Sequence, residues 1–271
     1  MTDAARDASW VYSPTETILD KVRRKVSRFT ARRPARFAFA RPTLSISFDD
    51  APVSATRAGA EILERHGVRG TFFVSAGLAG RDSPMGVYAG FEDFRRLADA
   101  GHEIGCHTFS HLDCGRACGD VIASDVTLND TSLLEHGFRT ETFAYPYGEV
   151  STTAKAMLGP RFKALRTVNA GMVDGSADLN WLPGVGVEGP DGEARARRWL
   201  DKAAAKNAWV ILYTHDVRPD PSEWGCSPET LERLLTDALA AGFHAAPVKD
   251  ALAAGLNQAL SSSPSGEGEA A

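Results

Sequence analysis

Short runs of β-branched and aromatic residues alternate along this chain with longer segments whose apolar residues recur at helical spacing. The runs predict strands at 44–48, 70–75, 103–106, 142–145, 164–167, 185–187, 209–213 and 244–247. The longer segments predict helices at 54–66, 91–100, 119–136, 151–158, 191–205 and 227–241. Strands that alternate with helices in this way form βα units, and eight of them favour an α/β barrel built on parallel strands.

The two ends of the chain differ from this regular middle. Ser13-Pro14-Thr15-Glu16 matches the start of a helix, and residues 14–30 predict a basic amphipathic helix. Its apolar face can pack on the domain behind it, which we favour, or the helix can lie on an anionic membrane surface. Residues 32–42 predict a linker, and the Ser-, Gly- and Glu-rich end predicts a disordered tail. We therefore divide the chain into the helix with its linker (1–41), one α/β domain (42–255) and the tail (256–271).

Composition places the chain among ordinary globular proteins. It has 271 residues, of which 43% are hydrophobic and 24% are charged, with a mean hydropathy of -0.21. These values exclude collagen-like, wholly disordered and disulfide-stapled classes. No apolar run approaches the roughly 20 residues of a membrane-spanning helix. The first ten residues lack the apolar core of a signal peptide and only four cysteines are present, so a cytoplasmic location is expected.

Charge is unevenly distributed along the chain. Residues 1–41 carry ten Lys and Arg against four Asp and Glu, whereas the remaining residues carry 20 against 31. The bulk of the protein is therefore acidic, and nucleic acid is not expected as a partner. Only the basic leader suits an anionic surface, so a peripheral association with the inner face of the membrane would involve residues 14–30.

Acidic and histidine residues follow several predicted strands at their carboxyl ends, where barrels place their chemistry. Asp49 and Asp50 follow the first strand, and this pair either turns the chain or binds a cation. His107 and His111 follow the third strand at i, i+4 spacing, which on a helical turn puts both imidazoles on one face. Two histidines and one carboxylate are typical of a catalytic metal with open positions. His215 ends a late strand and would face that site.

Two other metal sites compete with this interpretation. Cys106, Cys114 and Cys118 crowd around the histidines and could form a structural zinc knot with them, although no second cysteine pair stands at a distance. Two histidines and a carboxylate also bind iron(II) in oxygenases, but those sites normally lie on an all-β barrel. We favour the catalytic divalent site because strands and helices alternate here.

Five segments resemble, in order, the sequence of the polysaccharide deacetylases, carbohydrate esterase family four, also called the NodB-homology family. Ser47-Phe48-Asp49-Asp50 resembles the first motif, Gly70-Thr71-Phe72-Phe73-Val74 the second strand, and the segment from Gly101 to His111 the second motif. The segment from Phe143 to Gly148 is similar to the third motif, and Leu212-Tyr213-Thr214-His215 to the fifth. The resemblance implies a distorted (β/α) barrel with fewer than eight regular units and an open groove for a sugar chain.

The resemblance also implies a role for each matched residue. Asp50, His107 and His111 would bind one divalent ion, usually Zn²⁺ in this family, with Co²⁺ or Ni²⁺ also able to serve. Asp49 would be the general base toward the attacking water, and His215 the general acid that protonates the leaving amine. The backbone N–H near Tyr147, which follows Pro146, would help to hold the oxyanion.

The chain departs from the family's pattern at two motifs. Ala144 stands where many members have an arginine, and we predict that Arg166, at the end of the next strand, orients Asp49 instead. The fourth motif is faint in this sequence. Within it, Asp178 is predicted to tune His215, and Trp181 to form an apolar wall for the acetyl methyl group.

Together these features predict a hydrolase of carbon–nitrogen bonds other than peptide bonds. Its partner would be an N-acetylated glycan or glycan precursor, with N-acetylhexosamine units of a bacterial polysaccharide of the exopolysaccharide type as the substrate. One alternative is an amide or imide hydrolase of a small metabolite on the same fold. Another is a non-catalytic glycan-binding relic, which would have little physical reason to retain both an acid and a base. Oligomeric state is not predicted by the sequence.

Overall fold

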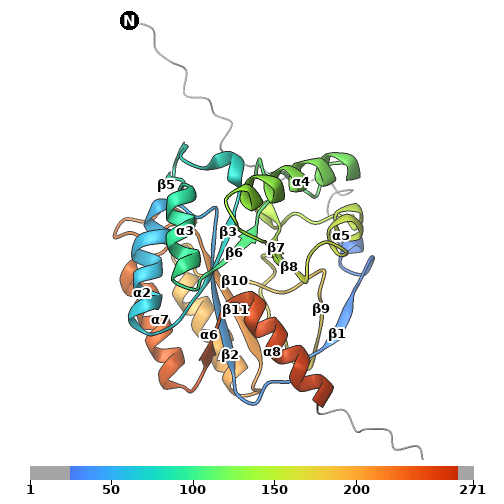
Figure 1. Cartoon of the computed structure of the whole chain (residues 1–271). Helices are drawn as coiled ribbons and strands as arrows, with labels where there is room; N and C mark the ends of the chain where they lie inside the picture. Colours follow the sequence, from blue (N-terminus) through green and yellow to red (C-terminus); the bar gives the residue numbers. More distant parts are fainter. Residues whose placement is uncertain (1–24, 262–271) are drawn as a thin grey trace, which may run out of the picture.

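The computed structural model describes residues 25–261 and contains one central sheet of parallel strands (Figure 1). The strands follow the order β10-β11-β2-β3-β6-β7-β8, and β12 pairs with β2 beside this path. Their bounds are β2 (Thr43–Asp49), β3 (Thr71–Val74), β6 (Glu103–Cys106), β7 (Thr142–Ala144), β8 (Ala164–Arg166), β10 (Val185–Gly186), β11 (Trp209–Thr214) and β12 (His244–Ala245). All the strands predicted from the sequence are present, which confirms the α/β fold class.

Strand β2 lies in the middle of this sheet and is buried along its whole length. It pairs in parallel with β3 on one side and with β11 on the other. The ring of Phe48 stacks on that of Phe72 from β3, with centroids 4.7 Å apart. Because these strands are parallel and in register, their carboxyl ends meet at one edge, which brings the residues after β2, β6 and β11 together.

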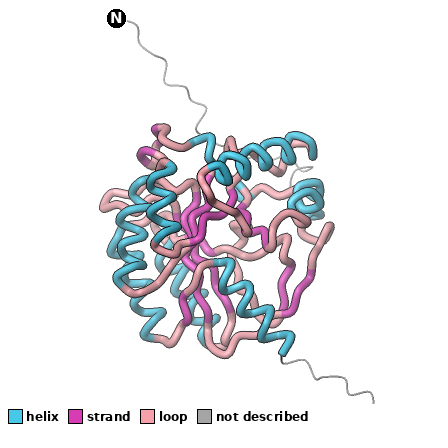
Figure 2. Tube along the Cα trace, in the orientation of Figure 1, coloured by secondary structure: helices cyan, strands magenta, loops and turns pink. Residues whose placement is uncertain are grey.

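Helices surround the sheet, as Figure 2 shows. They are α2 (Ala60–Arg65), α3 (Phe91–Asp99), α4 (Gly119–Glu135), α5 (Thr152–Leu158), α6 (Gly192–Ala204), α7 (Pro228–Ala240) and α8 (Val248–Ser261). The segment predicted as a helix over 54–66 contains a π-helical turn at Ala55–Gly59 before α2. Ser151 and Ser227 accept hydrogen bonds from the first turns of α5 and α7, which fixes where these two helices begin.

The barrel is irregular between β8 and β10. In this gap Leu182 forms an isolated parallel bridge with Arg166 in place of a full strand. The Thr167 N–H donates to the Leu182 carbonyl at 2.8 Å, and the Leu182 N–H donates to the Leu165 carbonyl at 2.8 Å. This bridge connects β8 to the segment just before β10, in agreement with the distorted barrel that the motifs imply.

The segment predicted as a linker is part of the fold. Pro34–Arg36 forms strand β1, which pairs antiparallel with β9 (Ser176–Asp178). Phe37 is buried and stacks on Phe39, and both rings contact Trp209 of β11. The linker prediction for residues 32–42 is therefore wrong, because burial of these aromatic rings against the sheet outweighs the Arg- and Pro-rich local sequence.

Helix α8 has no counterpart among the predicted helices. It runs past residue 255, so the predicted tail boundary at 256 is wrong and residues 256–261 are helical. Gly255 faces Phe37 and Phe39 so closely that an added Cβ would collide with the Phe39 ring. At its start, the Lys249 N–H donates to Glu103 Oε2 at 2.9 Å. The helix therefore closes the floor of the barrel, at the end opposite the carboxyl edge.

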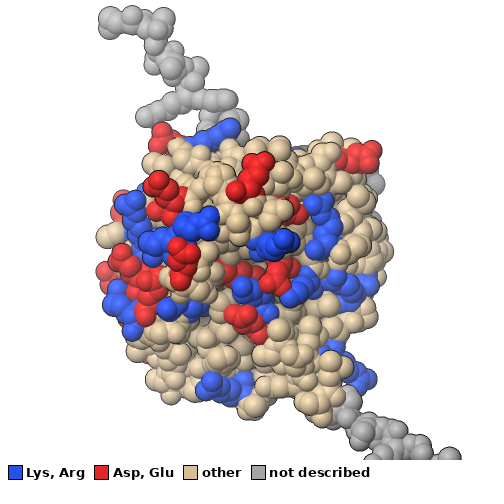
Figure 3. Space-filling view, in the orientation of Figure 1, with Lys and Arg blue, Asp and Glu red and all other residues tan. Residues whose placement is uncertain are grey.

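The helix predicted over 14–30 lies mostly outside the described residues, as does the end of the tail at 262–271. In its described part, residues 25–27 are helical, and Val26 and Phe29 are 49% and 66% exposed. Across residues 25–261 no helix combines the length and the apolar character needed to cross a membrane. On the face drawn in Figure 3, acidic and basic side chains are intermixed.

Candidate metal centre and active site

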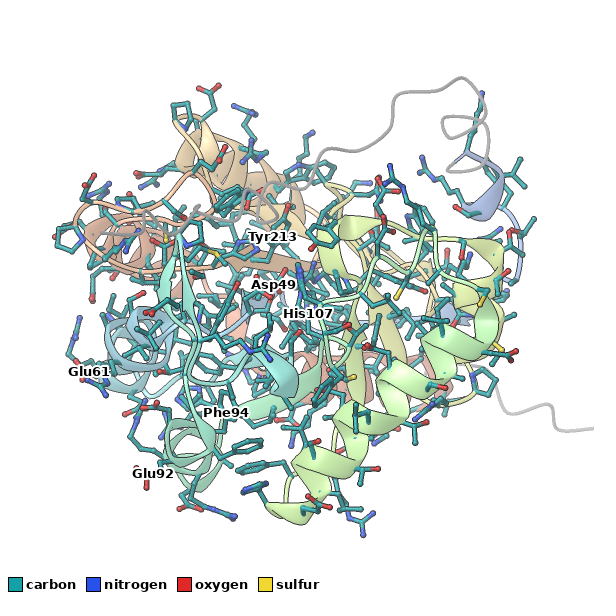
Figure 4. The ribbon with its side chains drawn as sticks, turned by 90° about the horizontal axis from the view of Figure 1, so that it is seen from above. Asp49, Glu61, Glu92, Phe94, His107 and Tyr213 are labelled. Atoms are coloured by element: carbon teal, nitrogen blue, oxygen red, sulfur yellow. The ribbon has the colours of Figure 1, made fainter. Side chains whose placement is uncertain are left out.

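Three strands deliver predicted site residues to one cavity at the carboxyl edge of the sheet. Asp49 is the last residue of β2, His107 follows β6 and His215 follows β11. The cavity has a volume of about 500 Å³. In Figure 4, Asp49, His107 and Tyr213 lie together near the centre of the molecule. The lining also includes Asp50, His111, Tyr147, Glu188 and Trp224.

Asp50, His107 and His111 form the one cluster of three metal-binding side chains within residues 25–261, and one ligand atom of each lies within 4.8 Å of the others. His111 Nε2 is 3.3 Å, and His107 Nε2 3.8 Å, from Asp50 Oδ1. That oxygen is buried and accepts no hydrogen bond. His107 Nδ1 is hydrogen-bonded to the Ala144 carbonyl at 2.8 Å, which leaves Nε2 as the ligand atom. The donor set therefore fits a divalent ion.

Burial sets the charge of these three side chains. It lowers the pKa of His107 and of His111 to about 4, so both imidazoles are neutral near pH 7, as a metal ligand must be. Burial also raises the pKa of Asp50, against the attraction of the nearby histidines. A buried carboxylate without a hydrogen bond gains most from a cation placed beside it.

The loop that joins the two histidines differs from the expected helical turn. Residues 107–111 are not helical, so the predicted geometry is wrong although the rings do approach, with centroids 4.9 Å apart. Asp125 of α4 holds the loop: its carboxylate accepts from the Phe109 N–H and from the Ser110 hydroxyl, both at 2.6 Å. The Asp125 carboxylate thus accepts hydrogen bonds from backbone N–H groups that, in a helix, would donate to backbone carbonyls. Sequence reasoning missed Asp125 because it resembles any acid on an amphipathic helix.

Backbone strain is concentrated around the cavity. Within the described part of the chain, seven non-glycine residues have positive φ, and five of them lie here. These are Asp50 (φ 61°), Ala51 (φ 47°), Thr108 (φ 63°), His111 (φ 57°) and Tyr147 (φ 58°). Left-handed conformations of such residues cost energy and persist where surrounding contacts impose them, which is common at functional sites.

Arg166 of β8 contacts Asp49, as predicted from the absence of an arginine at Ala144. Its Nη2 donates to Asp49 Oδ1, and both side chains are buried. The guanidinium also lies over the rings of Phe73 and Tyr213, 5.2 Å and 4.9 Å from their centroids. Burial opposes ionisation of Asp49, but the charge of Arg166, with the neighbouring histidines, outweighs it and lowers the pKa of Asp49. The carboxylate is therefore held ionised and in one orientation.

His215 is held by a backbone carbonyl and faces a carboxylate. Its Nδ1 is hydrogen-bonded to the Trp224 carbonyl at 3.0 Å. Glu188 lies just beyond β10, with Oε2 3.6 Å from the same nitrogen and Oε1 accepting from the Tyr213 hydroxyl at 3.1 Å. Burial raises the pKa of Glu188, and the nearby His215 opposes this. Sequence reasoning missed Glu188, although it directly follows the strand predicted at 185–187.

Asp178 and Trp181 lie elsewhere, so their predicted roles beside His215 and the acetyl group are wrong. Asp178 accepts from Lys155 Nζ at 2.8 Å, and the Lys155 ammonium lies 5.4 Å from the centre of the Trp181 ring. Neither residue lines the cavity. The reason is topological: Asp178 belongs to β9, which pairs with β1 rather than with the central sheet, and this carries the segment away from His215.

Tyr147 lines the cavity, whereas Pro146 is buried and does not. The Tyr147 ring meets that of His111 edge-on, with centroids 4.3 Å apart. The contact between the Tyr147 backbone N–H and an oxyanion stays a prediction. Leu78, Met85, Tyr88 and Trp224 form an apolar cluster that also lines the cavity. Met85 lies in the turn between β4 (Asp82–Ser83) and β5 (Gly86–Val87).

The cysteines do not join the metal cluster. Cys106 and Cys114 are buried in an apolar cluster, and burial raises the pKa of Cys106 to about 12, so it stays a thiol. Cys118 is exposed at the start of α4. Within the described residues the cluster of metal-binding side chains contains no cysteine, so the three thiols do not form the alternative site that their spacing allowed.

Known proteins match the chain over this same region. Residues 38–159 match the family model for polysaccharide deacetylase. The chain is 28% identical over 213 residues to a chitin deacetylase of Arthroderma benhamiae, covering 78% of this chain and 52% of that protein. It is 25% identical over 118 residues to the peptidoglycan-N-acetylglucosamine deacetylase PgdA of Listeria monocytogenes, covering 43% and 24%. The chain thus spans about half, or less, of the length of these curated relatives.

Solved structures share the fold. The chitin deacetylase of Colletotrichum lindemuthianum aligns over 79% of this chain and 89% of its own, with a TM-score of 0.56 and 20% identity. PdaA of Bacillus subtilis, a family 4 carbohydrate esterase, aligns over 88% and 90%, with a TM-score of 0.54 and 17% identity. A CE4 family pseudoenzyme from Bacillus anthracis aligns over 80% and 68%, with a TM-score of 0.56 and 15% identity. At identities of 15–20%, these alignments show a shared fold and nothing further.

The order of the motifs, the positions of the strand ends and the family match all point to the same residues around the cavity. The matched residues contain the first two motifs and the third, and these supply Asp49, Asp50, His107 and His111 to the cavity. The barrel is the fold of the family 4 structures. Residues 38–159 of the chain therefore match the polysaccharide deacetylase family, and the barrel has the fold of the family 4 carbohydrate esterases.

Proposed function

We propose that this protein is a metal-dependent N-deacetylase that hydrolyses the acetamide of N-acetylhexosamine units and releases acetate. One observation carries the proposal: Asp49 and His215 share a cavity with the cluster of Asp50, His107 and His111. Amide hydrolysis of this type needs a base for water, an acid for the leaving amine and a positive centre for the carbonyl oxygen. The cavity offers a side chain or ligand set for each.

Asp49 is the base in this proposal. Its lowered pKa keeps the carboxylate ionised near neutral pH, and Arg166 fixes its orientation. It takes a proton from water as the water oxygen bonds to the acetamide carbon. His215 then gives a proton to the nitrogen as the carbon–nitrogen bond breaks, so the products are acetate and a free amine.

The metal is proposed to be Zn²⁺, with Co²⁺ or Ni²⁺ as substitutes, because two imidazoles and a carboxylate suit all three. When bound, such an ion supplies Lewis-acid chemistry, which polarises a carbonyl and eases deprotonation of water. The chain's own part is to hold the ligands. The Ala144 carbonyl orients His107, and the Asp125 carboxylate shapes the loop that carries His111.

The proposed substrate is a bacterial glycan, such as an exopolysaccharide, or its precursor. Similarity to proteins named for chitin and for peptidoglycan N-acetylglucosamine supports an N-acetylated sugar. A small amide or imide is the second candidate, and the apolar side chains of Leu78, Met85 and Tyr88 in the lining of the cavity favour it because they suit a ligand with apolar groups. A purely glycan-binding role is disfavoured, since base and acid are both present with their supporting contacts.

The test is acetate release from N-acetylglucosamine oligomers, lipid-linked precursors and acetylated small molecules, with and without a chelator. We expect release from a sugar substrate, loss with chelator and recovery on adding Zn²⁺. Release without oxygen would exclude an oxygenase. Activity on small amides alone would favour the second candidate, and glycan binding without any release by the Zn²⁺-loaded protein would favour the binding role.

We further propose a cytoplasmic location with peripheral docking of residues 14–30 on the inner face of the membrane. The basic leader and the exposed side chains of Val26 and Phe29 support this docking. A variant that lacks residues 1–24 and also carries Val26→Ser and Phe29→Ser tests it by cell fractionation, because these changes remove the proposed docking surface and spare residues 33–39, which pack on the barrel. If the shortened variant stays equally membrane-associated, the docking proposal is wrong.

A further inference from the structure

The loop between β11 and α7 wraps around a fully buried carboxylate that the proposed chemistry does not use. Asp216, next to His215, has 0% exposure. Its Oδ2 accepts from the Ser222 N–H at 2.9 Å, and its Oδ1 accepts from the Ser222 hydroxyl. Arg218 Nε lies 2.9 Å from Oδ2 and supplies the opposite charge. Residues 217–226 are thus folded around one side chain.

The same loop returns to His215 through Trp224. The Ser222 hydroxyl accepts from the Trp224 N–H at 3.2 Å, which links Asp216 to Trp224. The Trp224 carbonyl in turn accepts from the His215 N–H at 3.2 Å and contacts His215 Nδ1 at 3.0 Å. Gly225 lies against Asp216, where an added Cβ would collide with Oδ1. A side chain there would push the loop, and the carbonyl with it, off the carboxylate.

This arrangement determines which ring nitrogen of His215 carries the proton. A carbonyl oxygen only accepts hydrogen bonds, so Nδ1 must be the protonated nitrogen beside Trp224. Nε2 is then the nitrogen that exchanges a proton with a reacting group. Glu188 lies 3.6 Å from Nδ1, but its Oε2 makes no hydrogen bond, so the carbonyl rather than the carboxylate fixes the ring.

We propose that Asp216 is a positioning residue, which acts through Ser222 and the Trp224 carbonyl to hold His215 in the Nδ1–H tautomer. The inference rests on the proposed function for its consequence, because the tautomer matters for catalysis only if His215 Nε2 delivers the proton to a leaving nitrogen. The hydrogen-bond relay itself, from Asp216 to Ser222 to Trp224 to His215, does not depend on that function.

The experiment uses the full chain loaded with Zn²⁺ and variants Asp216→Ala, Ser222→Ala and Ser222→Thr. Asp220→Ala is the matched control, since it removes an exposed carboxylate from the same loop. Nitrogen-15 NMR of the imidazoles, with the His215 signals assigned by His215→Gln, reports the tautomer without any need for turnover. Acetate release gives kcat and KM, and Zn²⁺ content and thermal unfolding are measured alongside.

We expect the Nδ1–H form in the wild type and in Asp220→Ala, and a mixture of tautomers in Asp216→Ala and Ser222→Ala. In these two variants kcat should fall at least about tenfold, part of the 10²–10⁴ that a general acid contributes, with Zn²⁺ content unchanged. Ser222→Thr keeps the hydroxyl and should restore both readouts. KM should change less than kcat.

An unchanged His215 tautomer in folded Ser222→Ala would overturn the inference, and so would a wild type in the Nε2–H form. Ser222 is half-buried, so this variant keeps the test available if Asp216→Ala does not fold. Failure of the proposed function looks different: the tautomer shifts as expected, but no protein releases acetate from any substrate.

Discussion

Arg166 at the end of β8 and Asp49 at the end of β2 form a buried ion pair, with Arg166 Nη2 donating to Asp49 Oδ1. The two residues stand 117 positions apart in the chain, and β3, β6 and β7 separate their strands in the sheet. The rings of Phe73 and Tyr213 pack against the guanidinium. The barrel therefore places an arginine of β8 beside Asp49, and we propose that it substitutes for the arginine that the third motif lacks.

Replacing Arg166 with Gln should impair both catalysis and stability. It leaves the Asp49 carboxylate buried without its partner, a change that typically costs about 3–5 kcal/mol. Because Arg166 lowers the pKa of Asp49, its loss should move the acid limb of kcat/KM to higher pH. In the wild type the lowered pKa of Asp49 stabilises the fold at pH values above the usual carboxyl pKa. This stabilisation is lost as the pH falls through the lowered pKa of Asp49.

Arg161→Gln is the control for that prediction, since Arg161 pairs with Asp130 at a partly exposed site. Urea unfolding and the pH profile of acetate release are the measurements. An acid limb that stays in place in Arg166→Gln would contradict the role assigned to the arginine.

The sequence predicts best those features whose signal is local. The apolar run at Trp209–Thr214 is buried throughout and forms β11, and β2 is equally clear. Because a barrel places its functional residues at the carboxyl ends of its strands, the predicted strand ends point to Asp49, His107 and Arg166. The same rule applied to the predicted strand at 185–187 points to Glu188, so that signal was present but unused.

Features that depend on distant contacts were beyond such reasoning. Strand β1 has three residues and exists only because it pairs with β9, about 140 positions later. The loop that carries His111 takes its shape from Asp125 rather than from its own spacing. Asp178 has the residue type expected near His215, but its strand leads it to Lys155 instead. A local sequence pattern does not reveal these partners, because each contact forms between residues far apart in the chain when the domain packs.

Asp49→Asn should keep the metal and lose the reaction. Asn is nearly isosteric with Asp, and the ligands Asp50, His107 and His111 stay intact, but the amide does not take a proton from water. We expect a loss of about 10²–10⁴ in kcat, the usual contribution of a general base. His111→Ala should lose Zn²⁺ and activity together. Zn²⁺ content and acetate release separate the two, and full activity in Asp49→Asn would remove the base assignment.

His215→Ala should lower kcat by about 10²–10⁴ with Zn²⁺ content unchanged, since the leaving amine would depart without a proton donor. The loss should be smaller for substrates whose leaving nitrogen is less basic, because these need less protonation. Single-turnover acetate release measures the step directly. A loss of less than tenfold on every substrate would mean that another group is the acid.

Glu188→Gln should lower kcat by about tenfold, equivalent to about 1.4 kcal/mol of transition-state stabilisation. The carboxylate lies 3.6 Å from His215 Nδ1 and stabilises the positive charge that the ring carries before it gives up its proton. Asp178→Asn is the comparison, because the sequence predicts for Asp178 the place beside His215 that Glu188 occupies in the structure. Steady-state kinetics on folded protein should show little change in Asp178→Asn, and the reverse ranking would restore the fourth-motif assignment.

Asp178→Ala should instead destabilise the fold. Lys155 is completely buried, and its ammonium donates to Asp178 Oδ2 at 2.8 Å and to the Ser27 carbonyl at 3.1 Å. Removing the Asp178 carboxylate leaves the buried Lys155 ammonium without a counter-charge. The free energy of unfolding, measured in urea, should therefore fall by about 3–5 kcal/mol. The double variant with Lys155→Met should lose less than Asp178→Ala alone, because it removes the stranded charge as well.

The exposed pair of Lys206 and Asp174 provides the matched control for this buried pair. Its side chains are 55% and 41% exposed and 2.6 Å apart. Exposed pairs contribute about 0–1 kcal/mol, so Lys206→Ala should barely change the unfolding midpoint. If Asp178→Ala costs no more than Lys206→Ala, Lys155 is not held as a buried charge. If it costs several times more while acetate release per folded molecule is preserved, the Lys155 and Asp178 pair anchors the segment before β1 and takes no part in catalysis.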